Sequence, residues 1–269
     1  MARKVVVVTG ATRGIGRNTA LYFAKKDYTV IGTGRDEAKL DELQTELSEF
    51  SIENKAWKLD VTKPESSQQV VQEVADAFGR IDVWVNNAGS FKAIGPTWEV
   101  DAENWVTDVT TNLIGTFYCV QAIVPQLLKQ GSGRIVNIVG GGTFSAFPYG
   151  NGYGTSKTAI ARLTENLAAE LADTDVKAFA LDPGLNDTDM TRYQRDTDIG
   201  QKYLPKIEEL FEEGVDVPPE RAPMFVHAFG EGRLDEFEGR IVTVNEELKE
   251  YEKESSLEES DFKLRYMKK

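Results

Sequence analysis

The chain alternates short apolar runs with longer segments of mixed polarity. Most of the runs are continuously apolar and rich in Val and Ile, which is typical of parallel strands buried on both faces. The intervening segments have helical composition and repeat their apolar residues every three or four positions. This alternation predicts βαβ units and an α/β fold, with a doubly wound parallel sheet of about seven strands in a single domain. The predicted strands are residues 4–8, 28–33, 55–59, 81–85, 134–139, 176–181 and 240–244.

Two segments depart from this alternation. Residues 189–223 are long, mixed in polarity and rich in proline near their end. Because they directly follow a predicted strand, we expect a substrate lid there, with a plain surface excursion as the alternative. Residues 246–269 are highly charged, and apolar positions return only at Phe262, Leu264 and Tyr266. We therefore expect one domain over residues 1–245, followed by a tail that docks on this domain or on a neighbouring subunit.

Composition and charge exclude several classes of function. The 269 residues include 31 Lys+Arg and 44 Asp+Glu, a net charge of −13, with a single His and a single Cys. An acidic protein is unsuited to nucleic acid or to an anionic membrane surface. One His and one Cys cannot build the usual zinc sites, and one Cys cannot form a disulfide within the chain. No apolar run reaches the length of a membrane span. We expect a soluble, cytoplasmic protein with no metal, nucleic-acid or membrane partner.

A glycine-rich segment directly follows the first predicted strand. Residues 9–16 read Thr-Gly-Ala-Thr-Arg-Gly-Ile-Gly and lead into a helical stretch. A glycine-rich turn between a strand and a helix directs backbone N–H groups at a helix N-terminus, where a phosphate is favoured. Gly10 suits the tight turn, Gly14 the close approach of a pyrophosphate, and Gly16 the packing of helix against strand. This context favours a dinucleotide site over an ordinary turn.

The end of the second predicted strand indicates which dinucleotide is bound. An NAD site usually offers an acid there for the ribose 2′-hydroxyl, whereas a 2′-phosphate requires an arginine. The strand continues into Gly34 and Arg35, and Arg13 in the glycine-rich segment is a second cation within reach. Guanidinium groups bind phosphate in a bidentate manner. The sequence therefore favours NADP(H); the alternative is that Arg35 pairs with Asp36 or Glu37 in solvent.

Tyr153 and Lys157 begin another helical stretch. Residues four positions apart share a helix face, so their side chains can point into one cleft. A nearby ammonium group favours tyrosinate and lowers the tyrosine pKa from about 10 towards the working pH. The pair therefore suits general acid/base catalysis, although such a spacing also occurs by chance.

Together these motifs resemble the short-chain dehydrogenase/reductase family over residues 3–245. The resemblance implies a Rossmann fold that binds NADP(H) and transfers a hydride between this cofactor and a small carbonyl or alcohol substrate. It also implies a homotetramer or homodimer formed through the helices after Asn87 and at Tyr153. Further matching motifs are Asp60-Val61, Asn86-Asn87-Ala88-Gly89, Thr111-Asn112-Leu113 and Pro183-Gly184-Leu185-Asn186-Asp187-Thr188.

The resemblance implies a role for each matching residue. Tyr153 would donate a proton to the carbonyl oxygen. Lys157 would bind the nicotinamide ribose and lower the pKa of Tyr153, and Asn112 would hold a water behind Lys157. The implied cofactor contacts are Gly10, Thr12, Arg13, Gly14, Ile15, Gly16, Gly34, Arg35, Asp60, Val61, Asn87, Ala88, Gly89, Tyr153, Lys157, Pro183, Gly184 and Thr188.

One position departs from the family pattern. The family usually has a serine thirteen residues before the tyrosine, and this chain has Gly140 there, in a Gly-Gly-Gly run. Losing such a hydrogen-bond donor without replacement costs about 10²–10³ in rate. Thr143 or Ser145 can supply the hydroxyl instead, or the glycine turn can supply N–H groups or a bound water. The third alternative is a weakly active or non-catalytic protein that binds or senses NADP.

Other residues have both structural and functional interpretations. His227 and Cys119 are expected to be packing residues. Several aromatic residues near the motifs either line a substrate pocket or belong to the core; they are Phe91, Phe144, Phe147, Tyr149 and Tyr193. A 3-oxoacyl thioester substrate is a further alternative. It requires a basic patch near the lid, for which Lys202, Lys206 and Arg221 are the only candidates.

Overall fold

The computed structural model describes residues 3–50, 52–254 and 256–265, so the predicted apolar position Tyr266 lies outside it. Seven parallel strands form one sheet in the order β3-β2-β1-β4-β5-β6-β7. The fold class is therefore confirmed, and each strand lies within two residues of its predicted bounds. The strands are β1 (Val5–Val8), β2 (Thr29–Gly34), β3 (Lys55–Lys58), β4 (Val83–Asn86), β5 (Gly133–Ile138), β6 (Val176–Asp182) and β7 (Ile241–Thr243).

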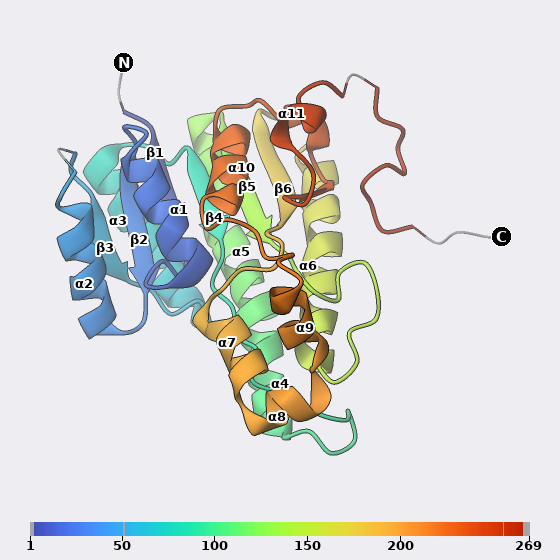
Figure 1. Ribbon diagram of the computed structural model, residues 1–269. Helices are drawn as coiled ribbons and strands as arrows, with labels where there is room; N and C mark the ends of the chain where they lie inside the picture. The colour runs from blue at the N-terminus through green and yellow to red at the C-terminus, as the bar shows by residue number, and fades with distance from the viewer. Residues whose placement is uncertain (1–2, 51, 255, 266–269) are drawn as a thin grey trace.

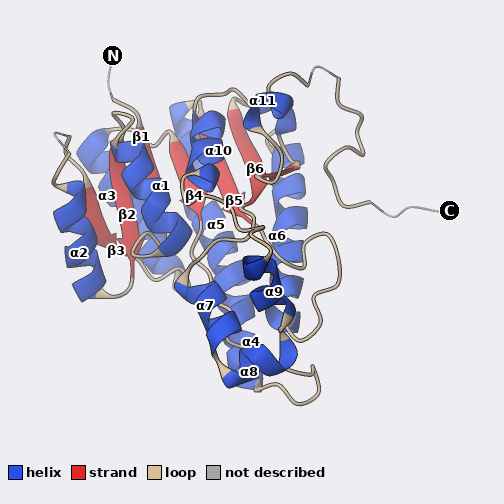
Figure 2. Ribbon diagram, in the orientation of Figure 1, coloured by secondary structure: helices blue, strands red, loops and turns tan. Residues whose placement is uncertain are grey.

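Helices cover both faces of the sheet (Figures 1 and 2). Successive residues of β1 point to opposite faces, so Val6 and Val8 pack in one core cluster and Val5 and Val7 in the other. Burial on both faces explains why the strands are continuously apolar. One face is covered by α1 (Gly14–Ala24), α2 (Glu37–Leu47) and α10 (Arg221–Gly230), and the other by α3 (Pro64–Phe78), α5 (Gly115–Gln130) and α6 (Asn151–Glu170).

The segment predicted as a lid is helical and lies near the carboxyl ends of the strands. In Figure 1 its helices, in orange, lie below the sheet, at the end of the molecule away from the N-terminus. They are α7 (Asp189–Asp196), α8 (Asp198–Tyr203) and α9 (Lys206–Glu212). Beside them, α4 (Ala102–Val109) continues through a π-helical turn at Thr110–Ile114 into α5. Within the described residues, no helix is both long and apolar enough to cross a membrane.

The charged tail docks on the body of the same chain. Its short helix α11 (Leu248–Tyr251) buries Tyr251, whose hydroxyl accepts a hydrogen bond from the Thr243 amide at 3.1 Å. Further along, the Phe262 carbonyl accepts a hydrogen bond from the Ile241 amide at 2.8 Å. The tail therefore covers the outer edge of β7, where unpaired backbone groups would otherwise be exposed.

Candidate active site

The glycine-rich turn between β1 and α1 packs tightly against the end of β4. Gly10 has a positive φ of 65°, and a Cβ atom there would lie 2.8 Å from the Ala88 Cα. A Cβ atom on Gly16 would lie 2.3 Å from the Gly10 carbonyl oxygen. Both positions therefore require glycine, in agreement with the predicted roles in the turn and in helix packing.

Hydrogen bonds tie this turn to the motif after β4. The Thr9 hydroxyl accepts from the amides of Asn87 and Ala88, each at 3.0 Å. In return, Asn87 Nδ2 donates to the carbonyls of Thr9 and Gly10 at 2.9 and 3.2 Å. The two strands are neighbours at the point where the strand order reverses. Doubly wound sheets bind their ligands at such a switch point.

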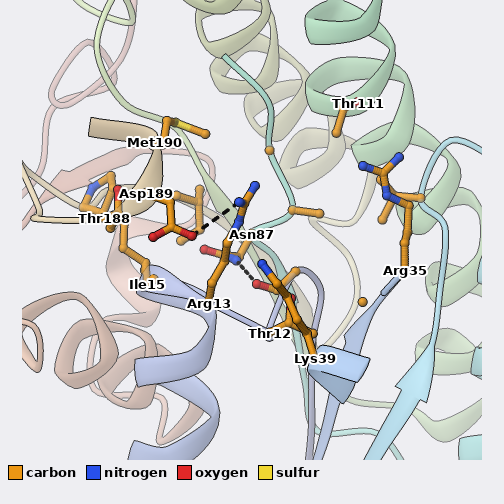
Figure 3. Close-up of a pocket in the computed structure, with 18 of the residues that line it drawn as sticks. Thr12, Arg13, Ile15, Arg35, Lys39, Asn87, Thr111, Thr188, Asp189 and Met190 are labelled. Atoms are coloured by element: carbon orange, nitrogen blue, oxygen red, sulfur yellow. Dashed lines mark hydrogen bonds and ion pairs between the residues drawn. The ribbon is translucent and has the colours of Figure 1, made fainter. Parts of the chain in front are cut away.

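A cleft of about 470 Å³ lies at this switch point (Figure 3). At its edge α1 begins at Gly14, and its N-cap residue Arg13 makes no side-chain capping bond within the described chain. The first amides of α1 are therefore free of a side-chain cap, which suits a phosphate group. The predicted residues that line the cleft are Gly10, Thr12, Arg13, Gly14, Ile15, Gly34, Arg35, Val61, Asn87, Ala88, Gly89, Tyr153, Lys157, Pro183 and Thr188.

Three predicted cofactor contacts, at Gly16, Asp60 and Gly184, do not line the cleft. The Asp60 carboxylate instead accepts hydrogen bonds from the amide and hydroxyl of Thr62 at 3.1 and 2.8 Å. The wall at this point is formed by Leu59 together with the predicted Val61. The Asp60 side chain therefore stabilises the turn that follows β3 by bonding to Thr62, which is a common local role of aspartate.

Two cations line the cleft, one from the connection between β2 and α2 and one from the first turn of α2 (Figure 3). Arg35 is exposed and has no ion pair within the described part of the chain. Its acidic neighbours are engaged elsewhere: Glu37 pairs with Lys58 at 2.6 Å, and Asp36 caps α2. Lys39, the second cation, was not predicted from the sequence, although a basic residue in the first helical turn after Arg35 is a readable signal. The alternative pairing of Arg35 with its neighbours is therefore not observed.

Arg13 approaches the same cleft from the opposite wall. Its Nη1 lies 3.4 Å from Oδ2 of Asp189, the first residue of α7, and Figure 3 shows this contact as a dashed line. Arg192 lies 3.5 Å from the same carboxylate. Both partners of the Arg13 contact are about half exposed, so the ion pair is weak. A phosphate group can displace Asp189 from Arg13 at little cost.

Tyr153 and Lys157 line the cleft from the first two turns of α6, as the spacing predicts. Lys157 Nζ donates to the Ile138 carbonyl at 2.7 Å, at the end of β5, and lies 5.5 Å from the centre of the Tyr153 ring. The tyrosine ring stacks on Phe91, with centroids 4.6 Å apart, and meets the edge of Phe147. These aromatic contacts fix the orientation of the phenol.

The electrostatics of this pair differ from the expectation. Burial raises the pKa of Tyr153, and the carboxylates of Asp182 and Asp108 raise it further. Burial also lowers the pKa of Lys157 to about 8. The prediction that Lys157 lowers the pKa of Tyr153 is therefore wrong for the protein by itself, because desolvation and the two acids outweigh a partly desolvated ammonium group. At neutral pH the phenol is protonated and suited to donate a proton.

Asn112 is fully buried in the π-helical turn before α5. Its Oδ1 accepts from the Ser90 amide at 2.7 Å, and its Nδ2 donates to the Ser90 carbonyl and the Ser156 hydroxyl, each at 2.9 Å. Its own carbonyl accepts from the Thr116 hydroxyl at 2.7 Å. The side chain thus fastens the loop after β4 to α6 and does not line the cleft. A water held by Asn112 stays a prediction.

The glycine turn that replaces the family serine lies against the Tyr153 hydroxyl. A Cβ atom on Gly140 would be 2.8 Å from that oxygen. The Thr143 hydroxyl donates to the Gly140 carbonyl at 2.6 Å and is buried. Ser145 is exposed and lines a separate surface hollow. Neither residue is among those that line the cleft, and both line that hollow instead. A role of either hydroxyl, of the glycine backbone or of a water bound to it stays a prediction.

Comparison with known proteins gives the family. Residues 4–199 match the family model described as short chain dehydrogenase, so the chain belongs to this family of oxidoreductases. An uncharacterized oxidoreductase of Staphylococcus epidermidis is 36% identical over 199 residues, which cover 74% of this chain and 84% of that protein. Sulfoacetaldehyde reductase 2 of Chromohalobacter salexigens is 37% identical over 190 residues, covering 70% and 74%. The resemblance inferred from the motifs is confirmed.

Solved structures agree with this assignment over nearly the whole chain. A variant of actinorhodin polyketide ketoreductase, solved with NADPH, is 30% identical with a TM-score of 0.82, covering 90% of this chain and 95% of that one. ElxO with NADP bound is 28% identical with a TM-score of 0.80, covering 90% and 97%. Both chains share the doubly wound fold described above.

Burial of Lys157 leads to a prediction about stability and pH. The pKa of this group is 10.5 in an ordinary environment and about 8 in the fold, so the folded protein binds fewer protons between these values. Stability therefore rises with pH across this window and falls as the pH drops through 8. Relative to Lys157→Met, the wild-type free energy of unfolding should increase by up to about 3 kcal/mol. Urea unfolding of both proteins at matched pH measures this, and a constant difference would contradict it.

Proposed function

We propose that the protein is an NADP(H)-dependent carbonyl reductase or alcohol dehydrogenase in which Tyr153 is the general acid/base. The observation that carries this proposal is the convergence of Tyr153 and Lys157 with the glycine-rich turn in one cleft. The nicotinamide cofactor, when bound, supplies or accepts the hydride. The Tyr153 phenol donates its proton to the carbonyl oxygen as negative charge develops there, and it accepts the proton in the oxidation direction. Its raised pKa favours donation.

The residues around the cleft fit a dinucleotide with a 2′-phosphate. The uncapped amides at the start of α1 suit the pyrophosphate, and Arg35, Lys39 and Arg13 supply positive charge for the additional phosphate. This concentration of cations stands out in a chain with a net charge of −13. The NADPH and NADP complexes of the two solved relatives support the same choice.

The thioester alternative receives less support from the lid. Arg221, one of its three candidate cations, donates to the Val244 carbonyl at 2.8 Å and pairs with Glu247 at 2.9 Å. Lys202 lies with its amino group 4.7 Å from the centre of the Tyr203 ring. Only Lys206 has no partner within the described residues. One lysine does not make the basic patch that an acidic acyl carrier would require.

The first test replaces the proton donor. Tyr153→Phe keeps the ring that stacks on Phe91 but removes the hydroxyl, so NADPH-dependent carbonyl reduction should fall by about 10³-fold. Binding of NADPH, measured by fluorescence titration, should change little. If wild type and variant both bind NADPH and are equally inactive over a broad set of carbonyl compounds, the protein is the non-catalytic NADP-binding alternative.

Gly140→Ser gives this test a second arm. If the enzyme works through its glycine turn, the added side chain crowds the Tyr153 hydroxyl and lowers turnover, because its Cβ atom would lie 2.8 Å from that oxygen. A gain in turnover would instead show that the wild-type site is impaired by the missing serine.

The second test concerns the choice of cofactor. Arg35→Ala removes a guanidinium group that has no other ion pair in the described chain, so the affinity for NADPH should fall by about 10-fold or more and that for NADH should change little. Lys55→Ala removes a cation of the neighbouring strand β3 that is not part of the cleft and pairs with Glu53, and it serves as the control. Equal losses for NADPH and NADH in Arg35→Ala would contradict the 2′-phosphate assignment.

We also propose that the protein is a homodimer, of the two states that the resemblance implies. Val106, Phe117 and Leu128 are 55%, 43% and 45% exposed and recur every eleven residues along the continuous helix formed by α4, the π-helical turn and α5. Phe117 and Leu128 both lie on α5 about three turns apart and form an apolar stripe on one helix face, whereas the π-helical turn sets Val106 off from that face. The tail already covers the β7 edge, so we place the interface at this stripe.

Light scattering should therefore give twice the chain mass of 29.9 kDa. Phe117→Glu introduces a charge into the stripe and should give a monomer that stays folded by circular dichroism. Phe144→Glu, at an exposed position in the loop after β5 and away from the stripe, should leave the dimer intact. A wild-type monomer would contradict the proposal.

A further inference from the structure

An apolar cluster closes over the ring of Tyr153. One half of the cluster belongs to the body of the protein, and the other half belongs to the lid segment, residues 189–223. The two halves meet beside the cleft, so a carbonyl group that reaches the Tyr153 hydroxyl has its substituents next to them. The body supplies Phe91, Ile94, Phe147 and Tyr153, and the lid supplies Met190, Tyr203, Leu204 and Ile207.

The two halves make different contributions. Phe91, Ile94 and Leu204 are almost completely buried and form the floor of the cluster. Phe147 and Ile207 are only partly buried, so they retain surface for a substrate. When a substituent of the substrate enters between the two halves, contacts between the apolar side chains are replaced by contacts of these side chains with the substituent. This exchange is favourable for a hydrocarbon group and costly for a polar group that finds no partner.

The charges around the cluster act against an anionic substrate. Lys157, the nearest cation to the Tyr153 ring, is held by the Ile138 carbonyl. The lid segment carries nine Asp+Glu and five Lys+Arg, and its Arg192 and Arg195 are already paired with aspartates of the same segment.

Two buried acids add to this effect. Asp108 lies beneath the loop that carries Phe91 and accepts hydrogen bonds from the Lys92 and Ala93 amides at 2.9 Å. Asp182 ends β6 and accepts from the Gly184 amide at 3.3 Å. Both carboxylates disfavour negative charge on the Tyr153 oxygen, and they disfavour a carboxylate, sulfonate or phosphate on a neighbouring substrate for the same reason.

We propose that the site takes uncharged ketones or aldehydes with an apolar, preferably aromatic, substituent, and that it discriminates against anionic carbonyl compounds. The substituent lies between Phe147 on the body and Ile207 on the lid segment, with the carbonyl oxygen at the Tyr153 hydroxyl. This inference rests on the proposed function, because it assigns a substrate class to the same site.

A matched pair of substrates tests the charge. Methyl 4-acetylbenzoate and 4-acetylbenzoate have the same reacting ketone and ring, and only the second is an anion at neutral pH. With NADPH and the wild-type protein, kcat/KM for the ester should exceed that for the acid by at least about 30-fold. Equal kcat/KM values would overturn the inference and leave the proposed function intact. If neither compound, nor any other carbonyl in the panel, is reduced, it is the proposed function that fails.

Matched variants test the position of the substituent. Phe147→Ala and Ile207→Ala should each lower kcat/KM for the ester about 10-fold relative to propanal, a small aldehyde with no aromatic substituent to place between these two side chains. The controls are Phe144→Ala on the same loop and Ile199→Ala in the lid segment; both residues are exposed and outside the cluster, so the ratio should not change. The ratio of two substrates on one protein does not depend on the fraction that is correctly folded. An unchanged ratio in both cluster variants would overturn the placement between body and lid.

Discussion

The contact between the glycine-rich turn and the end of β4 is the constraint on which the site depends. Thr9 and Asn87 exchange hydrogen bonds across neighbouring strands, and the Gly10 backbone approaches Ala88 so closely that a side chain at Gly10 would not fit. The turn is thereby held at the point where the strand order reverses, between β1 and β4, and the start of α1 faces the cleft at this point. Every other component of the site is positioned relative to this junction.

The second determinant is the low polarity of the region around Tyr153. Stacking on Phe91 and closure by the lid segment remove water from the phenol and from Lys157, and this desolvation moves the two pKa values in opposite directions. Both shifts favour the neutral forms: the phenol is protonated at neutral pH, and Lys157, with a pKa of about 8, loses its proton more readily than an exposed lysine. The same apolar enclosure underlies the substrate class proposed above.

The lid segment and the glycine-rich turn also face each other across the cofactor cleft. Arg13 contacts Asp189 at the start of the lid segment, and Thr188 lies 3.2 Å from the position of a Cβ atom on Gly14. Both partners of this ion pair are about half exposed, so the contact is weak and does little to hold the lid segment against the turn.

Periodicity and local chemistry determined the fold. Strands buried on both faces must be continuously apolar, and tight turns between parallel strands and helices require glycine, so both features are visible as patterns in the chain. The same holds for the Tyr153 and Lys157 pair, because residues four apart on a helix share a face whatever surrounds them. Arg35 was predictable for a similar reason: it directly follows β2, and the carboxyl ends of parallel strands are where such sheets bind their ligands. These inferences needed only residues close together in the sequence.

The remaining features depended on contacts between distant segments. Asp60 was expected at the cofactor and turns to Thr62, and the Thr143 hydroxyl was offered as a replacement for serine and bonds to Gly140. The direction of the Tyr153 pKa shift was reversed because burial by Phe91 and charge from Asp108 and Asp182 come from separate parts of the chain. Desolvation and through-space charge are properties of the packed interior and have no local sequence signature. The sequence alone thus determined the fold, the glycine-rich turn and the placement of Tyr153 and Lys157 on one helix face, whereas tertiary packing decided their protonation, the partners of Asp60 and Thr143, and the apolar surroundings of Tyr153.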